Sequence, residues 1–108
     1  MWEIEYIPEA RKELLELDGS VRKKVEKSII KVSSNPLPKS EGGYGNPLGN
    51  KQGRNLTGLL KIKLLKEGIR VVYKLVHENN RMKIIVIGAR ADSEVYEQAA
   101  ERIYKNKI

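Results

Sequence analysis

The sequence contains no cysteine and only one histidine, His77, among its 108 residues. Without thiols the chain can form neither disulfides nor thiolate metal sites, and a lone histidine cannot build a multi-histidine site. We therefore expect no metal and no cofactor, and we interpret His77 as a surface residue near the end of a strand. The lack of cysteine fits a reducing compartment, so we expect a cytoplasmic location.

Long apolar runs and targeting signals are also missing. No apolar run is long enough to span a bilayer, and residues 1–5 lack the basic and apolar regions of a signal peptide. The glycine-rich stretch at 33–55 contains no GxxxxGK[ST] pattern, which excludes a phosphate-binding loop of that kind. With 40% hydrophobic and 32% charged residues, the sequence predicts one water-soluble domain over 1–108 with no membrane partner.

The basic charge is concentrated in the second part of the chain. The net charge is +7 overall, but −4 over residues 1–18 and +11 over the remainder. Residues 51–90 contain ten lysines and arginines against two glutamates. Such a block is typical of a protein that binds a polyanion, although a solvated, lysine-rich surface produces the same pattern.

The hydrophobic periodicity predicts an α+β fold. We expect a strand over 2–6, a helix from Pro8 and a second helix capped by Ser20, which form an N-terminal helical hairpin. A long loop over 33–55 precedes strands at about 58–65, 69–77 and 81–88, and Asp92 caps a C-terminal helix. The order β-α-α-β-β-β-α predicts an antiparallel sheet of about four strands, with the nearly apolar third run central in it.

Three cations are predicted to share one face of this sheet. Lys61 and Lys63 are two residues apart and alternate with leucine and isoleucine, so both point to the solvent side. A slip of one residue in the next strand would bury Arg70 and Lys74, so the register must place Arg70 on the lysine face. Cations this close repel one another, and a polyphosphate removes that repulsion.

The third strand and the last helix add two further candidates. Gly88-Ala89-Arg90 carries Arg90 to the end of the sheet, and Tyr96 follows one turn into the helix. A partly exposed tyrosine ring provides a plane on which an unpaired base stacks, so we expect a single-stranded nucleic-acid site. The alternative for Tyr96 is packing in the core of the domain.

Two segments of the sequence are similar to a known family. The string "LTGLLKIKLLKEGIRVVYKL", followed by "IIVIGARADSEVYEQAAERI", resembles the RelE family of toxins from toxin–antitoxin systems, and the similarity extends over nearly the whole chain. The K-x-K, G-x-R-x-V-Y and G-x-R…S-E-V-Y elements occur in the family's order. Through these elements, the resemblance assigns the family's functional positions to five residues of this sequence: Lys61, Lys63, Arg70, Arg90 and Tyr96. Asp92 departs from relatives that have a basic residue there, and a helix cap is its expected role.

The resemblance implies an endoribonuclease that enters the ribosomal A site and cuts mRNA without a metal, by attack of the RNA's own 2′-OH. One of Lys61 and Lys63 is the expected base, since neighbouring cations disfavour its charged form. The other lysine and Arg70 would stabilise the phosphorane, and Arg90 would contact the scissile phosphate or assist the leaving oxygen. The expected partners are mRNA, the small ribosomal subunit and a short acidic antitoxin of the RelB kind.

Two other functions are compatible with parts of the pattern. ParE-type toxins look similar but act on DNA gyrase and have no nuclease activity, and they do not need the five-residue set. A plain RNA- or DNA-binding module would need only the basic sheet face.

Overall fold

Five strands form a single mixed sheet in the computed structural model, which describes residues 1–51, 54–89 and 91–108. The strands are β1 (Glu3–Tyr6), β2 (Asn46–Lys51), β3 (Arg54–Leu64), β4 (Ile69–Val76) and β5 (Arg81–Gly88). The helices are α1 (Pro8–Glu16), α2 (Gly19–Ser33) and α3 (Asp92–Asn106), with short 3-10 turns at Lys39–Glu41 and His77–Asn79. The α+β class predicted from the sequence is confirmed.

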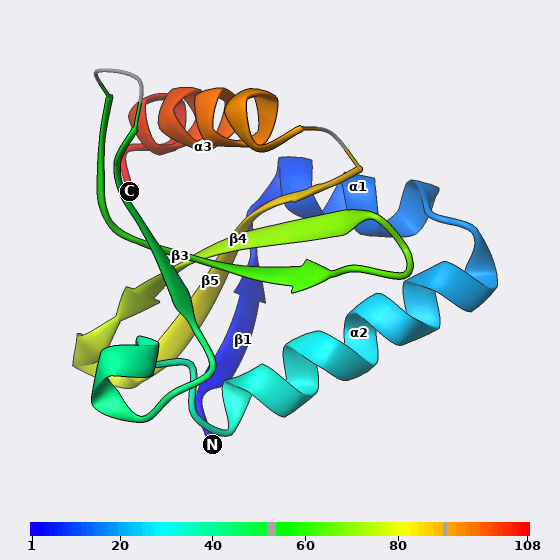
Figure 1. Ribbon diagram of the computed structural model, residues 1–108, viewed down its shortest axis with the longest axis horizontal. Coiled ribbons are helices and arrows are strands. Elements are labelled where there is room, and N and C mark those ends of the chain that lie inside the picture. The colour runs from blue at the N-terminus through cyan, green and yellow to red at the C-terminus, as the bar shows by residue number, and fades with distance from the viewer. Residues whose placement is uncertain (52–53, 90) are drawn as a thin grey trace.

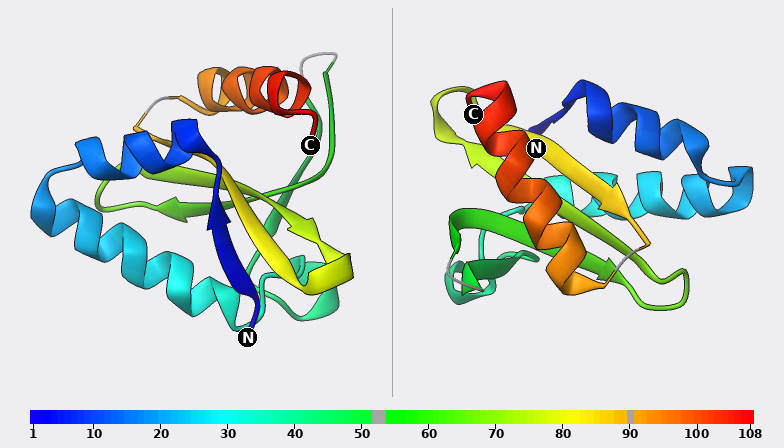
Figure 2. Two further views of the ribbon diagram at one scale, coloured as in Figure 1. Left: turned by 180° about the vertical axis from the view of Figure 1, so that it is seen from behind. Right: turned by 90° about the horizontal axis from the view of Figure 1, so that it is seen from above.

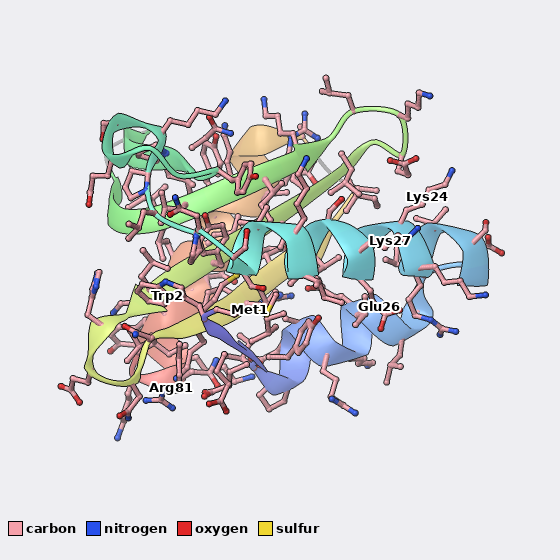
Figure 3. The ribbon with its side chains drawn as sticks, turned by 90° about the horizontal axis from the view of Figure 1, so that it is seen from below. Met1, Trp2, Lys24, Glu26, Lys27 and Arg81 are labelled. Atoms are coloured by element: carbon pink, nitrogen blue, oxygen red, sulfur yellow. The ribbon has the colours of Figure 1, made fainter. Side chains whose placement is uncertain are left out.

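The strand order across the sheet is β1-β5-β4-β3-β2. Strands β2 to β5 pair antiparallel with their neighbours, and β1 runs parallel to β5, so the sheet is mixed rather than purely antiparallel. β5 is an interior strand as expected, and β4 occupies the centre (Figure 1). Helix α3 covers one face of the sheet (Figure 2), and α2 lies across the other, in front of the strands when the molecule is seen from below (Figure 3). The sheet is therefore enclosed between two helical layers.

The helices begin where local chemistry favours them. Pro8 occupies the first turn of α1, where its missing N–H is not needed, and Glu9 lies at the positive end of the helix dipole. The cap of α2 is Asp18 rather than Ser20: its carboxylate accepts hydrogen bonds from the backbone N–H and the hydroxyl of Ser20. Asp92 is the first residue of α3, and Ala91 rather than Asp92 occupies the N-cap position.

The loop predicted over 33–55 contains a fifth strand. β2 pairs with β3, with Asn46 opposite Lys61 and Lys51 opposite Arg54, so the prediction of four strands missed one edge strand. Only one large apolar side chain in this strand is buried, that of Leu48, so the segment lacks the alternation that marks a strand. Pro47 is tolerated because an edge strand has N–H positions that need no partner.

The register of β3 and β4 is the predicted one. Lys63 lies opposite Arg70 and Leu60 lies opposite Tyr73. Apolar side chains pack on both faces of this pair: those on the face away from the lysines pack with α1 and α2, and a smaller set on the lysine face packs with α3. Burial of that set fixes the register, because a shift by one residue would exchange apolar side chains for cations.

The segment before β2 is held against the sheet by a buried tyrosine. The Tyr73 hydroxyl donates a 2.7 Å hydrogen bond to the carbonyl of Pro36, and burial raises the pKa of Tyr73 well above its usual value. A side chain at Gly45 would overlap this hydroxyl, so only glycine fits there. The loop around Tyr44 is therefore held close to the core through Tyr73.

Candidate active site

Three of the five predicted site residues lie together on the α3 face of β3 and β4. Lys61 and Lys63 follow one another along this face of β3, and Arg70 is the cross-strand neighbour of Lys63. Lys63 is exposed, whereas Lys61 and Arg70 are partly buried. Directly opposed residues in a sheet have Cβ atoms about 5 Å apart, so these cations can converge on a single phosphate group.

Tyr96 reaches the same site from α3. The Lys61 ammonium donates a hydrogen bond to the Tyr96 hydroxyl, and its Nζ lies 5.0 Å from the centre of the tyrosine ring. The hydrogen bond and the cation–π contact both fix the position of the lysine head. The structure thus joins the lysine strand and the last helix, as the sequence predicted.

The expectation of a partly exposed Tyr96 ring is wrong. The residue is only 5% exposed and belongs to the hydrophobic core beside Val95 and Ala99. Val95, Tyr96 and Ala99 follow the helical i, i+1, i+4 pattern, so all three fit on the stripe of α3 that faces the sheet. With its ring enclosed, Tyr96 offers no stacking plane in this arrangement, and its hydroxyl is the group directed at the site.

The fifth predicted residue, Arg90, lies outside the described residues. The strand that leads to it ends at Gly88, which is the cross-strand partner of Arg70. β5 therefore ends beside the cations of the site, and α3 begins two residues after position 90.

An ion pair that the sequence reasoning missed fastens α3 to the rest of the molecule. Arg102 of α3 donates hydrogen bonds of 2.6 and 2.9 Å to the two carboxylate oxygens of Glu13 in α1, and a third to the carbonyl of Ile85. Glu13 also accepts a hydrogen bond from the backbone N–H of Ile87, and its pairing raises the pKa of Arg102. A glutamate between the apolar positions of α1 was the only sequence signal for this contact.

His77 lies apart from the cations of the site. His77 is exposed at the end of β4, as predicted, and its ring meets that of Trp2 edge-on at 5.5 Å. Within residues 1–51, 54–89 and 91–108, no group of three or more histidine or acidic side chains is placed to hold a metal ion. Over the same residues, no helix is both long and apolar enough to cross a membrane.

Comparison with known proteins assigns the chain to a family. It is 31% identical over 100 residues to the mRNA interferase toxin RelE of Escherichia coli strain K12, an alignment that covers 93% of this chain and 95% of the relative. The chain belongs to the RelE family. The Shigella flexneri mRNA interferase RelE matches it at the same identity and coverage. No protein-family model matches the sequence.

Solved structures support the same assignment for this RelE-family chain. A free mutant of E. coli RelE superposes with a TM-score of 0.72 at 29% identity, covering 94% of this chain and 97% of that one. RelE in the intact E. coli RelBE toxin–antitoxin complex superposes with a TM-score of 0.66 at 25% identity, covering 84% and 99%. The family resemblance drawn from the K-x-K and G-x-R elements is thereby confirmed.

Proposed function

We propose that this chain is the toxin of a toxin–antitoxin pair and an endoribonuclease that cleaves mRNA in the A site of the ribosome, in the cytoplasm. The observation that carries the proposal is the cluster of Lys61, Lys63 and Arg70 on one face of β3 and β4, in a chain that belongs to the RelE family. The mRNA interferase names of the relatives support the same reaction.

In the proposed reaction, the cations of the site supply the positive charge and no metal takes part. One of Lys61 and Lys63 accepts the proton of an RNA 2′-OH, whose oxygen attacks the adjacent phosphorus. The other lysine and Arg70 stabilise the negative charge of the phosphorane, and Arg90 contacts the scissile phosphate or assists the departing 5′-oxygen. The P–O5′ bond breaks and the departing 5′-oxygen takes up a proton from Arg90 or from water, which leaves a 2′,3′-cyclic phosphate on one fragment and a 5′-OH on the other.

Tyr96 takes a positioning role in this mechanism. Its hydroxyl accepts a hydrogen bond from Lys61, and its enclosed ring limits the movement of that lysine. The ribosome supplies the remaining alignment of the RNA, since correct placement of reacting groups accounts for a large share of such rate enhancements.

The proposed partner that silences this chain is an acidic antitoxin. RelE of E. coli forms a complex with its antitoxin RelB, and the strongly basic region of this chain beyond residue 18 complements an acidic segment.

A three-way assay tests the proposed function. Purified protein is incubated with mRNA alone, with mRNA on programmed ribosomes, and with DNA gyrase in a supercoiling reaction. We expect cleavage within the A-site codon only when ribosomes are present. Inhibition of supercoiling without RNA cleavage would assign the chain to ParE-type action, and RNA binding without cleavage would reduce it to a binding module.

A further inference from the structure

A second basic surface borders the candidate active site at the edge of the sheet. A groove of about 410 Å³ lies between α2, the loop before β2 and the end of β3 that extends beyond β2. Its polar lining consists of Ser28, Lys31, Lys39, Tyr44, Asn46 and Lys63. Because Lys63 belongs both to this groove and to the active-site face, the two surfaces are continuous.

The charge and chemistry of the groove suit a nucleotide. Three lysines line it, and none of its described lining residues is acidic. Tyr44 is 44% exposed, and the ammonium of Lys31 lies 5.4 Å from the centre of its ring. An aromatic plane beside cations is the arrangement with which proteins hold single-stranded nucleic acids, the ring stacking on a base and the lysines contacting phosphates.

Tyr44 is held in place by the loop that carries it. Its backbone N–H donates to the carbonyl of Asn35, and that of Gly45 donates to the carbonyl of Leu37. The amide of Asn35 donates in turn to the carbonyl of Gly42 at 3.2 Å. A loop backbone held in this way loses little conformational freedom when a ligand binds, which favours affinity.

We propose that this groove binds a nucleotide of single-stranded RNA next to the one that is cleaved. The base stacks on Tyr44, Lys31 and Lys39 contact its phosphates, and Ser28 and Asn46 face the base edge and sugar. The proposal rests on the proposed function only for the position of the cleaved nucleotide beside Lys63. An acidic peptide would satisfy the lysines but would make no use of the exposed ring, so RNA is the better match.

Direct binding tests the proposal without cleavage. The probe is a fluorescently labelled, unstructured RNA of about ten nucleotides with 2′-O-methyl groups, which cannot be cut, and its affinity is measured by fluorescence anisotropy without ribosomes. We expect Tyr44→Ala to weaken binding about tenfold and Tyr44→Phe to remain near wild type. The exposed Lys23 on α2 lies outside the groove, so Lys23→Ala is the matched control for Lys31→Ala.

Two further measurements separate the base from the phosphates. An abasic version of the probe should bind wild type and Tyr44→Ala equally, because it has nothing to stack. Replacing Lys31 and Lys39 together should reduce the slope of log affinity against log salt by about 1.4, whereas Lys23→Ala should change affinity and slope less. Melting temperatures close to that of wild type would show that each variant is folded.

The results that overturn the proposal are distinct from a failure of the proposed function. Equal affinity of wild type and Tyr44→Ala for the RNA would overturn it, even if the chain cleaves mRNA normally. A decaglutamate peptide that binds as tightly as the RNA and depends equally on Tyr44 would overturn it and assign the groove to an acidic protein segment. Conversely, weaker RNA binding by Tyr44→Ala would support RNA binding in the groove even if the three-way assay detected no cleavage.

Discussion

Lys61 connects strand β3 with helix α3 through its contacts with Tyr96. It lies on the face of β3 that the sequence predicted to be exposed to solvent, yet it is partly buried because α3 covers this face, and its ammonium is fixed by the hydroxyl and the ring of Tyr96. Lys63, two residues further, remains exposed. The two lysines therefore occupy different environments although the sequence presents them as equivalent, and their chemical roles need not be interchangeable.

Substitutions of Tyr96 separate its packing from its contact with Lys61. We expect Tyr96→Phe to keep the melting temperature close to that of wild type and to lower the single-turnover cleavage rate about tenfold, the equivalent of one hydrogen bond to a charged group. Tyr96→Ala should lower the free energy of unfolding by about 3 kcal/mol or more, because it empties a core position. Thermal melts and cleavage on ribosomes measure the two effects, and a fully active Tyr96→Phe would exclude the positioning role.

The cluster of Lys61, Lys63 and Arg70 could be predicted from the sequence, but the environment of Tyr96 could not. The strand period of two places the cations on one face, and the cost of burying them sets the register. The exposure of Tyr96 depends instead on how α3 is rotated and tilted against the sheet. The Glu13–Arg102 pair contributes to that packing, and the two residues are 89 positions apart in the sequence.

Helix α3 is attached by two different kinds of contact along its length. Its first turns place Val95, Tyr96 and Ala99 in the core, whereas its last turns are joined to α1 by polar contacts. Beyond the Arg102–Glu13 pair, the amide of Asn106 donates to Glu9 at 3.2 Å. The polar contacts, together with the apolar packing of Ile103, hold the C-terminal part of the helix, and the apolar contacts of its first turns cover Lys61.

Removing Glu13 tests how firmly α3 is attached. Glu13→Ala leaves the guanidinium of Arg102 and the N–H of Ile87 without their acceptor, so the free energy of unfolding should fall by about 1–3 kcal/mol. Glu16→Ala, at an exposed position of the same helix, is the control and should change it by less than about 0.5 kcal/mol. Urea unfolding that does not distinguish the two variants would contradict this view of α3.

At the level of elements, the sequence predicted every helix and all strands except β2. The helices have an apolar stripe, and the strands other than β2 have alternating or continuous apolar residues, so the sequence itself indicates which of their side chains are buried. Strand β2 lies at the edge of the sheet, buries only Leu48 among its large apolar residues and contains proline and glycine. β2 forms because it pairs with β3, and the six residues of β2 alone do not indicate this pairing.

On the scale of the whole molecule, charge is divided between two regions. Residues 1–18 carry a net charge of −4, and the rest of the chain carries +11. The early acidic residues are partly used internally: Glu5 of β1 pairs with Arg81 and Lys83 of β5 at 2.8 and 3.2 Å. The excess of positive charge on the remaining surface is available for polyanions and for an acidic partner.

This charge predicts salt-sensitive binding of the antitoxin. The association rate constant with an acidic antitoxin should fall markedly between low and physiological salt, while dissociation should change less, because long-range attraction acts on the encounter. Stopped-flow mixing at several salt concentrations measures both. An association rate that does not depend on salt would contradict the electrostatic account.

The ion pairs of β1 predict that stability falls in acid. The hydrogen bond from Lys83, followed by that from Arg81, lowers the pKa of Glu5 below its ordinary value of 4.5. A carboxylate with a lowered pKa in the folded state stabilises the protein above its unfolded pKa, and this contribution disappears as the pH falls through the folded one. Urea midpoints should therefore fall between about pH 5 and about pH 3, and less steeply in Glu5→Gln; an equally steep fall would exclude Glu5 as a contributor.

The most direct test of the proposed function is cleavage of mRNA on programmed ribosomes by the Lys61→Ala/Lys63→Ala variant. Wild type should produce fragments with a 2′,3′-cyclic phosphate at the A-site codon. The variant should fold with a similar melting temperature and produce none, and the control Lys12→Ala/Lys23→Ala, which removes the same charge from exposed helix positions, should cleave like wild type. Cleavage by the Lys61→Ala/Lys63→Ala variant at the wild-type rate would contradict the account.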